Sequence, residues 1–141
     1  MNTLRTCLAF FSALEDHDVD RILPLCSPDA RAEFTPLGER VKGTVAELGN
    51  VVWSSLVETF PDLKIKINNI IWSVDRQRAE CHITFQGTQR YPFLGIDPSG
   101  NSLNIVKIFK LSFDRDGKIN SVQVSWQHNE FINQLISRHN R

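Results

Sequence analysis

The amino-acid sequence predicts an α+β fold in which helices pack over a curved, mainly antiparallel sheet. Three observations support this class. Through most of the first 60 residues, apolar residues recur every three or four positions, as in amphipathic helices. Over most of residues 63–127 they alternate with polar residues, as in strands. Asp116-Gly117 then joins the last two alternating runs as a hairpin turn. Helices followed by hairpin-linked strands are typical of α+β proteins.

The first predicted helix covers residues 3–16, whose apolar side chains form one stripe. Asp18 is expected to cap a short second helix, which Pro24 keeps from extending. Residues 31–35 then alternate as a strand does. The N-terminal part of the chain is therefore expected to be mainly helical, with one early strand.

A third helix is predicted over residues 45–59. Thr44 can cap its first turn, and Glu47 stands where a capping box requires it. Pro61 ends the helical pattern. We expect four strands after this helix, and residues 129–138 to close the chain as a helix or an irregular tail. The four strands are 63–74, 78–86, 102–113 and 118–127.

Composition and charge limit the classes of function. With 141 residues, of which 41% are hydrophobic and 23% charged, the chain has the length and composition of one folded domain, which we expect to cover residues 1–141. Its formal net charge is zero, so no overall field favours nucleic acid or a membrane surface as a partner. No apolar run approaches about 18 residues, and the start lacks a signal-peptide pattern. We therefore expect a cytoplasmic protein.

Nothing in the sequence indicates a metal or a cofactor. The three cysteines lie far apart, which argues against a disulfide framework and against a zinc site. The glycines form no nucleotide-binding pattern. Glu33, His82 and His128 are the only residues that suggest a metal site, and their spacing is not that of paired ligands. We expect neither a metal ion nor an organic cofactor.

Five short motifs follow one another along the chain. They are Phe60-Pro61-Asp62-Leu63, Gly87-Thr88, residues 93–100, residues 116–119 and Gln134-Leu135. In this order and spacing they resemble the SnoaL-like polyketide cyclases of the nuclear-transport-factor-2-like superfamily. The resemblance implies a cone-shaped sheet with helices at its mouth and an apolar cavity between them. It also implies that the convex side of the sheet forms a dimer interface.

The resemblance also identifies positions where family residues are replaced. Such cyclases use an aspartate near the end of the last strand to remove a proton alpha to a carbonyl. An ungapped register from residues 116–119, or back from Gln134-Leu135, places that aspartate at Gln127. The resemblance also implies that Gln89 and Phe109 stand where the family has two histidines. A carboxamide can hydrogen-bond a substrate but cannot act as the base. Gln127 and Gln89 are expected either to reach the cavity mouth or to be half-exposed residues at strand ends.

Three ionisable residues are candidates to replace the missing aspartate. Lys107 lies on an otherwise apolar strand face, where a desolvated lysine can serve as a base or a Schiff-base nucleophile. It could instead lie at an oligomer interface or reach out to water. Glu33 is either a pocket carboxylate or a solvated strand residue. His128 directly follows Gln127, so a one-residue bulge would exchange which of them points inward.

Two functions remain open at this stage. The first is a cofactor-independent cyclase or isomerase that acts on a polyketide-like or other apolar ring molecule. The second is a non-catalytic binding or assembly module of the same fold. We expect Trp53 to form part of the cavity wall, with Phe109 beside the ligand. A buried ionisable group with a shifted pKa in the cavity would favour the enzyme.

The last strand predicts self-association. Val122, Val124 and Trp126 alternate with polar residues, which gives this strand one apolar and one polar face. The resemblance implies a homodimer, or a higher homo-oligomer, formed through the convex side of the sheet. The alternation alone does not decide which of the two faces that is.

Overall fold

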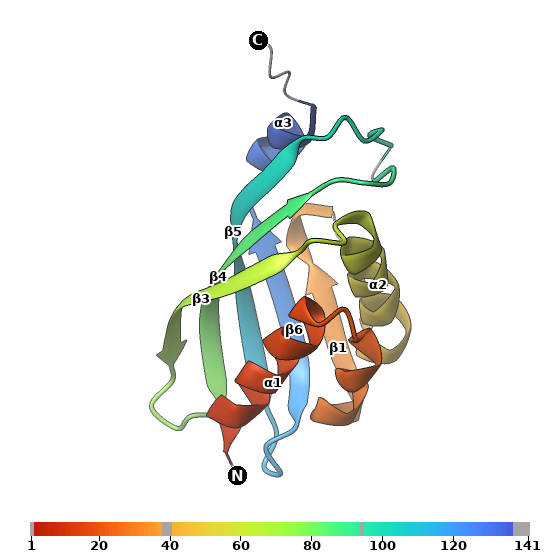
Figure 1. Ribbon diagram of the computed structural model, residues 1–141. Helices are drawn as coiled ribbons and strands as arrows, with labels where there is room; N and C mark the ends of the chain where they lie inside the picture. The colour runs from red at the N-terminus through yellow and green to blue at the C-terminus, as the bar shows by residue number, and fades with distance from the viewer. Residues whose placement is uncertain (1, 38–40, 94, 137–141) are drawn as a thin grey trace.

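The computed structural model describes residues 2–37, 41–93 and 95–136 (Figure 1). One six-stranded sheet has the order β2-β1-β6-β5-β4-β3. β1 pairs with β6 in parallel, and every other neighbouring pair is antiparallel. The predicted α+β class with a curved mixed sheet is thereby confirmed. The strands are β1 (Cys26–Phe34), β2 (Lys42–Thr44), β3 (Lys64–Trp72), β4 (Arg78–Thr88), β5 (Ser102–Phe113) and β6 (Ile119–Trp126).

Two helices lie over one side of the sheet, and a third lies near the start of β5 (Figure 1). They are α1 (Thr3–Glu15), α2 (Asn50–Thr59) and α3 (His128–Ile136). The Asn2 side chain caps α1 by accepting a hydrogen bond of 3.1 Å from the Arg5 amide. The expected helix 45–59 also forms, but its first five residues are a π-helical turn, η4 (Val45–Gly49). Thr44 caps that turn as predicted, accepting from the Glu47 amide at 3.2 Å.

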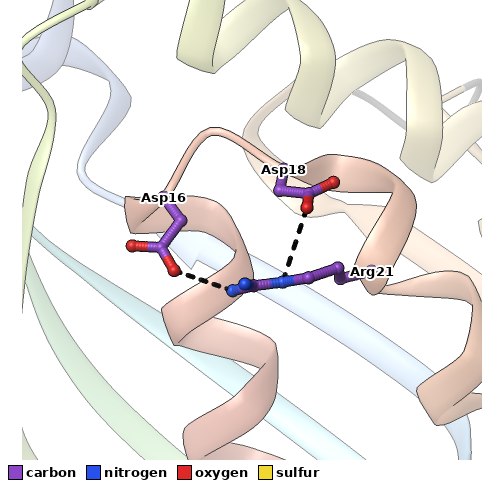
Figure 2. Close-up of polar contacts among 3 residues, drawn as sticks. All are labelled: Asp16, Asp18 and Arg21. Carbon is purple, nitrogen blue, oxygen red and sulfur yellow. Dashed lines mark hydrogen bonds and ion pairs between the residues drawn. The ribbon is translucent and has the colours of Figure 1, made fainter.

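The expected second helix is replaced by two short 3₁₀ turns, η1 (Val19–Arg21) and η2 (Leu23–Leu25). Asp18 makes no capping hydrogen bond there. Instead, Asp16 and Asp18 lie on two sides of the Arg21 guanidinium, with N–O distances of 2.9 and 3.8 Å (Figure 2). All three side chains are about half exposed, so these ion pairs add little stability.

Long-range pairing also lengthens the first strand. The sequence predicted residues 31–35, whereas β1 starts at Cys26, which pairs with Ile119 of β6. A bulge interrupts this pairing between Cys26 and Arg31. The local turn signal around Pro28 is therefore overridden by a distant strand, which the Ser27 hydroxyl also contacts by donating to the Ile119 carbonyl, 92 residues away in sequence. A 3₁₀ turn, η3 (Thr35–Leu37), follows β1 directly.

The core lies between the helices and the facing side of the sheet, and aromatic rings form its centre. Phe109 of β5 makes edge-to-face contacts with Phe10 and Phe11 of α1, with ring centroids 5.8 and 5.1 Å apart. Trp53 of α2 contacts Phe10 at 5.3 Å and Phe34 of β1 at 5.7 Å. These contacts join α1, α2 and two strands into one packed unit beside the cavity described next.

Candidate functional site

A small cavity lies between the inner face of the sheet, α2 and α3. Its volume is about 20 Å³, close to the space that one water molecule needs. One of its lining residues, Lys107, has an ionisable side chain; the others are apolar or aromatic. The lining residues are Phe34, Leu37, Val52, Trp53, Leu56, Phe93, Lys107, Phe109, Val124, Trp126 and Phe131.

Lys107 points into this cavity because residues alternate along β5. Leu103, Ile105, Phe109 and Leu111 of the same strand are buried on the same side, and Lys107 is only 5% exposed. Its Nζ lies over three rings, 4.4 Å from the centroid of Trp126, 4.7 Å from Phe85 and 5.5 Å from Phe131. The alternative positions for Lys107, at an interface or reaching water, are not those of the folded chain.

The surroundings of Lys107 determine its charge. Burial lowers the pKa of the Lys107 amine from 10.5 to about 7, because the interior solvates the ammonium poorly. The three ring faces attract a cation and oppose part of that change in pKa. Among the described residues, no carboxylate forms an ion pair with Nζ. Near neutral pH, a large fraction of this amine is therefore uncharged.

The rings around Nζ come from three different elements. Trp126 ends β6 and stands directly opposite Lys107 in the β5–β6 register. Its indole N–H donates to His128 Nδ1 at 3.1 Å, and the His128 ring stacks on Phe131 with centroids 6.0 Å apart. His128 itself does not line the cavity. Its position instead holds Trp126 and Phe131 against the lysine.

Two amide side chains fix α3, and with it Phe131. The Gln134 side chain accepts from the Asn104 amide at 2.6 Å and donates to the Asn104 carbonyl at 2.9 Å. The Asn101 side chain donates to the Leu135 carbonyl at 2.7 Å. The motif Gln134-Leu135 therefore has a physical role, because it docks α3 onto the start of β5. We call this pair of contacts with Asn104 the Gln134 clasp.

The structure brings some of the predicted ligand residues to the cavity. Trp53 and Phe109 both line it and are almost fully buried. A glycine at position 49 makes room for the indole, because a Cβ there would lie 2.7 Å from the Trp53 ring. Whether either ring contacts a ligand stays a prediction.

The two predicted glutamines lie elsewhere. Gln127 is exposed and does not line the cavity, because Trp126 is the last inward-facing residue of β6 and the next side chain faces away. Gln89 is buried outside the cavity, where its amide donates to the Tyr91 and Ile96 carbonyls at 2.9 and 2.8 Å. It shapes the loop before β5 rather than the cavity wall.

Glu33 lies on the other side of the sheet. Ala32 and Phe34 are buried, so the residue between them faces outward, where its register partner in β6 is Gln123. Of the three candidates for acid–base work, the structure therefore brings only Lys107 into the cavity. Sequence reasoning missed the contribution of Phe85 and Phe131. Phe85 shares the inner face with Lys107, but Phe131 depends on how α3 docks.

Other kinds of site find little support in the described residues. No group of three histidine, cysteine or acidic side chains is placed there to hold a metal ion. His82 pairs with Glu80 at 2.7 Å on the outer face. The described cysteines are free and buried. Over the same part of the chain, no helix combines the length and apolar character needed to cross a membrane.

Comparison with known proteins gives a consistent result. The SnoaL-like domain family matches residues 8–122. No curated protein matches the chain significantly. Several solved structures share the fold at about one residue in five identical, a level that supports the fold alone.

Three of these structures serve as examples. AclR from Streptomyces galilaeus, a candidate hydroxylase, is 22% identical with a TM-score of 0.80 and 94% coverage of both chains. A candidate SnoaL-like polyketide cyclase from Jannaschia sp. CCS1 is 20% identical with a TM-score of 0.80, over 96% of this chain and 92% of that one. SalBIII, an epoxide hydrolase/cyclase-like enzyme of pyran ring formation in salinomycin, is 20% identical with a TM-score of 0.72, over 91% and 92%.

Proposed function

Because the chain belongs to the SnoaL-like domain family, we propose that it is a cofactor-independent enzyme of the cyclase or isomerase type. Its substrate class is an apolar, ring-containing or polyketide-like carbonyl compound. Lys107 is the base that removes a proton alpha to the carbonyl. One observation carries the proposal: a lysine amine is buried in an otherwise apolar cavity, with no anionic partner among the described residues.

The chemistry follows from the state of the amine. The neutral Nζ takes the alpha proton, and the electron pair of the C–H bond moves into an enolate. The new ammonium lies against the Phe85, Trp126 and Phe131 rings, which attract a cation. An isomerase returns the proton to another carbon. A cyclase lets the enolate carbon attack a second carbonyl and returns the proton to the alkoxide that forms.

The size of the cavity sets a requirement for this function. Pockets for small molecules usually measure about 300–1,000 Å³, far more than the space present here. Leu37, Val52, Phe93 and Trp126 line the cavity and are only partly buried, so we place its mouth among them. A substrate enters by displacing these side chains, together with Phe131 of α3. The same residues then exclude water once it is bound.

Proton exchange tests the proposal without the natural substrate. The probe is 1-indanone, an apolar ring ketone, in D₂O buffer at pD 8, with loss of the alpha-proton signals followed by NMR. Wild-type protein is expected to accelerate exchange, and Lys107→Met to lose about 10²–10⁴ of that acceleration. Lys110→Met, on the exposed face of the same strand, is the matched control and keeps the wild-type rate.

Each result has a clear reading. Exchange by Lys107→Met at the wild-type rate would overturn the assignment of the base. If neither protein accelerates exchange although 1-indanone raises the melting temperature of both, the non-catalytic binding module is the better description. Circular dichroism of the variants establishes that the substitutions leave the fold intact.

A further inference from the structure

Lys107 is also the only nucleophile among the described residues that line the cavity. The remaining lining side chains are hydrocarbon or aromatic, and the two indole N–H groups among them, of Trp53 and Trp126, are not nucleophiles. Cys7, Cys26 and Cys81 lie in the core but not in the cavity wall. Any covalent bond between the protein and a molecule in this cavity therefore involves Nζ.

We infer that Lys107 Nζ forms an imine with the carbonyl carbon of an apolar aldehyde or ketone bound in this cavity. The inference rests on the proposed function in using the same cavity and carbonyl class. It assigns the amine a covalent bond in place of proton abstraction, because Nζ bonded to the carbonyl carbon is not at the same time the free base.

The polarity of the cavity orients the carbonyl group. Three lining side chains carry a hydrogen-bond donor, and the indole N–H of Trp126 already donates to His128, which leaves the Lys107 amine and the Trp53 indole for an entering carbonyl oxygen. Burying a carbonyl without a partner costs free energy, and a molecule whose oxygen accepts from Nζ also brings its carbonyl carbon to the amine. The apolar part of the molecule then lies against Trp53, Phe109 and Trp126.

The same environment favours the product of the reaction. A dry aromatic cavity solvates an ammonium poorly, and no carboxylate of the described residues compensates its charge. A neutral imine removes that charge from the cavity. Residues facing Nζ from the packed elements are likewise uncharged: Ile83 and Phe85 of β4, Val124 and Trp126 of β6, Phe131 of α3 and Trp53 of α2.

The step balances without any further reagent. The Nζ lone pair attacks the carbonyl carbon, a C–N bond forms, and one amine proton moves to the oxygen to give a carbinolamine. Loss of that oxygen as water takes the second amine proton and leaves a C=N bond. The overall change is amine plus carbonyl to imine plus one water. Addition of water reverses the sequence and releases the lysine.

Reductive trapping tests the inference. Full-length protein at pH 7 is incubated with one of two probes, ¹³C-formaldehyde or benzaldehyde, and is quenched at timed intervals with sodium borohydride, which reduces neutral as well as protonated imines. Modified lysines are mapped by peptide mass spectrometry. Formaldehyde reports access to the amine, and benzaldehyde the apolar carbonyl class. An exposed lysine titrates near 10.4, so very little of it is neutral at pH 7. Lys107 is expected to react at least about tenfold faster than Lys110 in the same chain.

The two proposals can fail separately. Modification spread over the exposed lysines while Lys107 stays unmodified with both probes overturns the imine. If Lys107 still catalyses 1-indanone exchange in that case, it is a base only. Rapid trapping of Lys107 without exchange supports the imine and removes the proton-abstraction function. Modification of Lys107 by formaldehyde but not by benzaldehyde overturns the apolar carbonyl class. Lys107→Met gives the background for each arm.

Discussion

Lys107 and Lys110 lie three residues apart on β5 and differ in burial and in the residues beside them. Lys110 is exposed and stands between Glu80 and Gln123 in the strand register. Lys107 is buried and stands between Ile83 and Trp126. An odd spacing on a strand places two side chains on opposite faces, so one lysine meets solvent and polar neighbours while the other meets aromatic rings.

The difference between these two lysines indicates that Lys107 is the one that contributes less to the stability of the fold. Lys110 occupies a position where a charged side chain is ordinary. Lys107 occupies one where an apolar residue of similar length would pack well without the cost of burying an amine. A residue that weakens its own core without an ion pair in return is a candidate for function rather than for stability.

The largest effect is expected from Lys107→Met. The folded-state pKa of about 7 lies below the ordinary 10.5, so between these values the unfolded chain binds more protons than the folded chain. Wild-type stability therefore rises with pH across this window. At pH 6.5 the variant is expected to be more stable by about 2–4 kcal/mol, and at pH 9.5 this advantage shrinks by about 3 kcal/mol. Urea unfolding at both pH values measures the change.

Lys110→Met is the control for that measurement. Its free energy of unfolding is expected to follow the wild type to within about 0.5 kcal/mol at both pH values, because Lys110 is exposed to solvent and a substitution there changes little buried surface. A constant difference between wild type and Lys107→Met from pH 6.5 to 9.5 would show that the Lys107 amine is solvated in the folded protein.

Most of the strands and helices could be predicted from the sequence, because amphipathic periodicity indicates which face of each element is buried. The exceptions depend on distant contacts. β1 begins at Cys26 because β6 pairs with it, and no local signal around Pro28 indicates that. Asp18 binds Arg21 instead of capping a helix, a choice between two nearby partners that propensity does not decide.

The site was predicted less completely than the fold. The apolar face around Lys107 indicated an unusual lysine, but the sequence left open whether that face lines a cavity or an interface. The family register pointed to Gln127, which strand alternation places outside. One of the three rings around Nζ is that of Phe131 from α3, and the docking of α3 depends on the Gln134 clasp. The contact between Gln134 and Asn104 joins residues 30 positions apart, and the periodicity of the sequence does not predict such a contact.

The outer face of the sheet is where we propose that two copies of the chain associate. Val106 lies there, 47% exposed, one residue before the buried Lys107. Val106→Glu is expected to weaken a homodimer by at least about tenfold, because a carboxylate would be desolvated in the contact. Light scattering at tens of micromolar protein gives the oligomeric state. A wild-type monomer at that concentration would remove the homodimer.

Gln134→Ala is expected to expose the Lys107 amine to solvent more, as the Lys110 side chain is exposed. Loss of the Gln134 clasp removes two hydrogen bonds to Asn104, which lies at the surface and can bind water instead, so the variant should lose about 1 kcal/mol of stability. Phe131 then covers Nζ less well, and the pKa of Lys107 is expected to rise towards its ordinary value. NMR titration of ¹³C-methylated Lys107 measures this. An unchanged pKa would mean that α3 stays docked through Asn101.

The smallest effect is expected from Glu33→Gln, which tests the outer face directly. Glu33 is partly exposed on that face, with Gln123 as its β6 neighbour, so the amide keeps its size and loses only a solvated charge. Its free energy of unfolding should change by less than about 0.5 kcal/mol, and 1-indanone exchange should keep the wild-type rate. A loss of exchange comparable to that of Lys107→Met would mean that a carboxylate reaches the substrate, and that the sheet opens further than the packing around Phe34 allows.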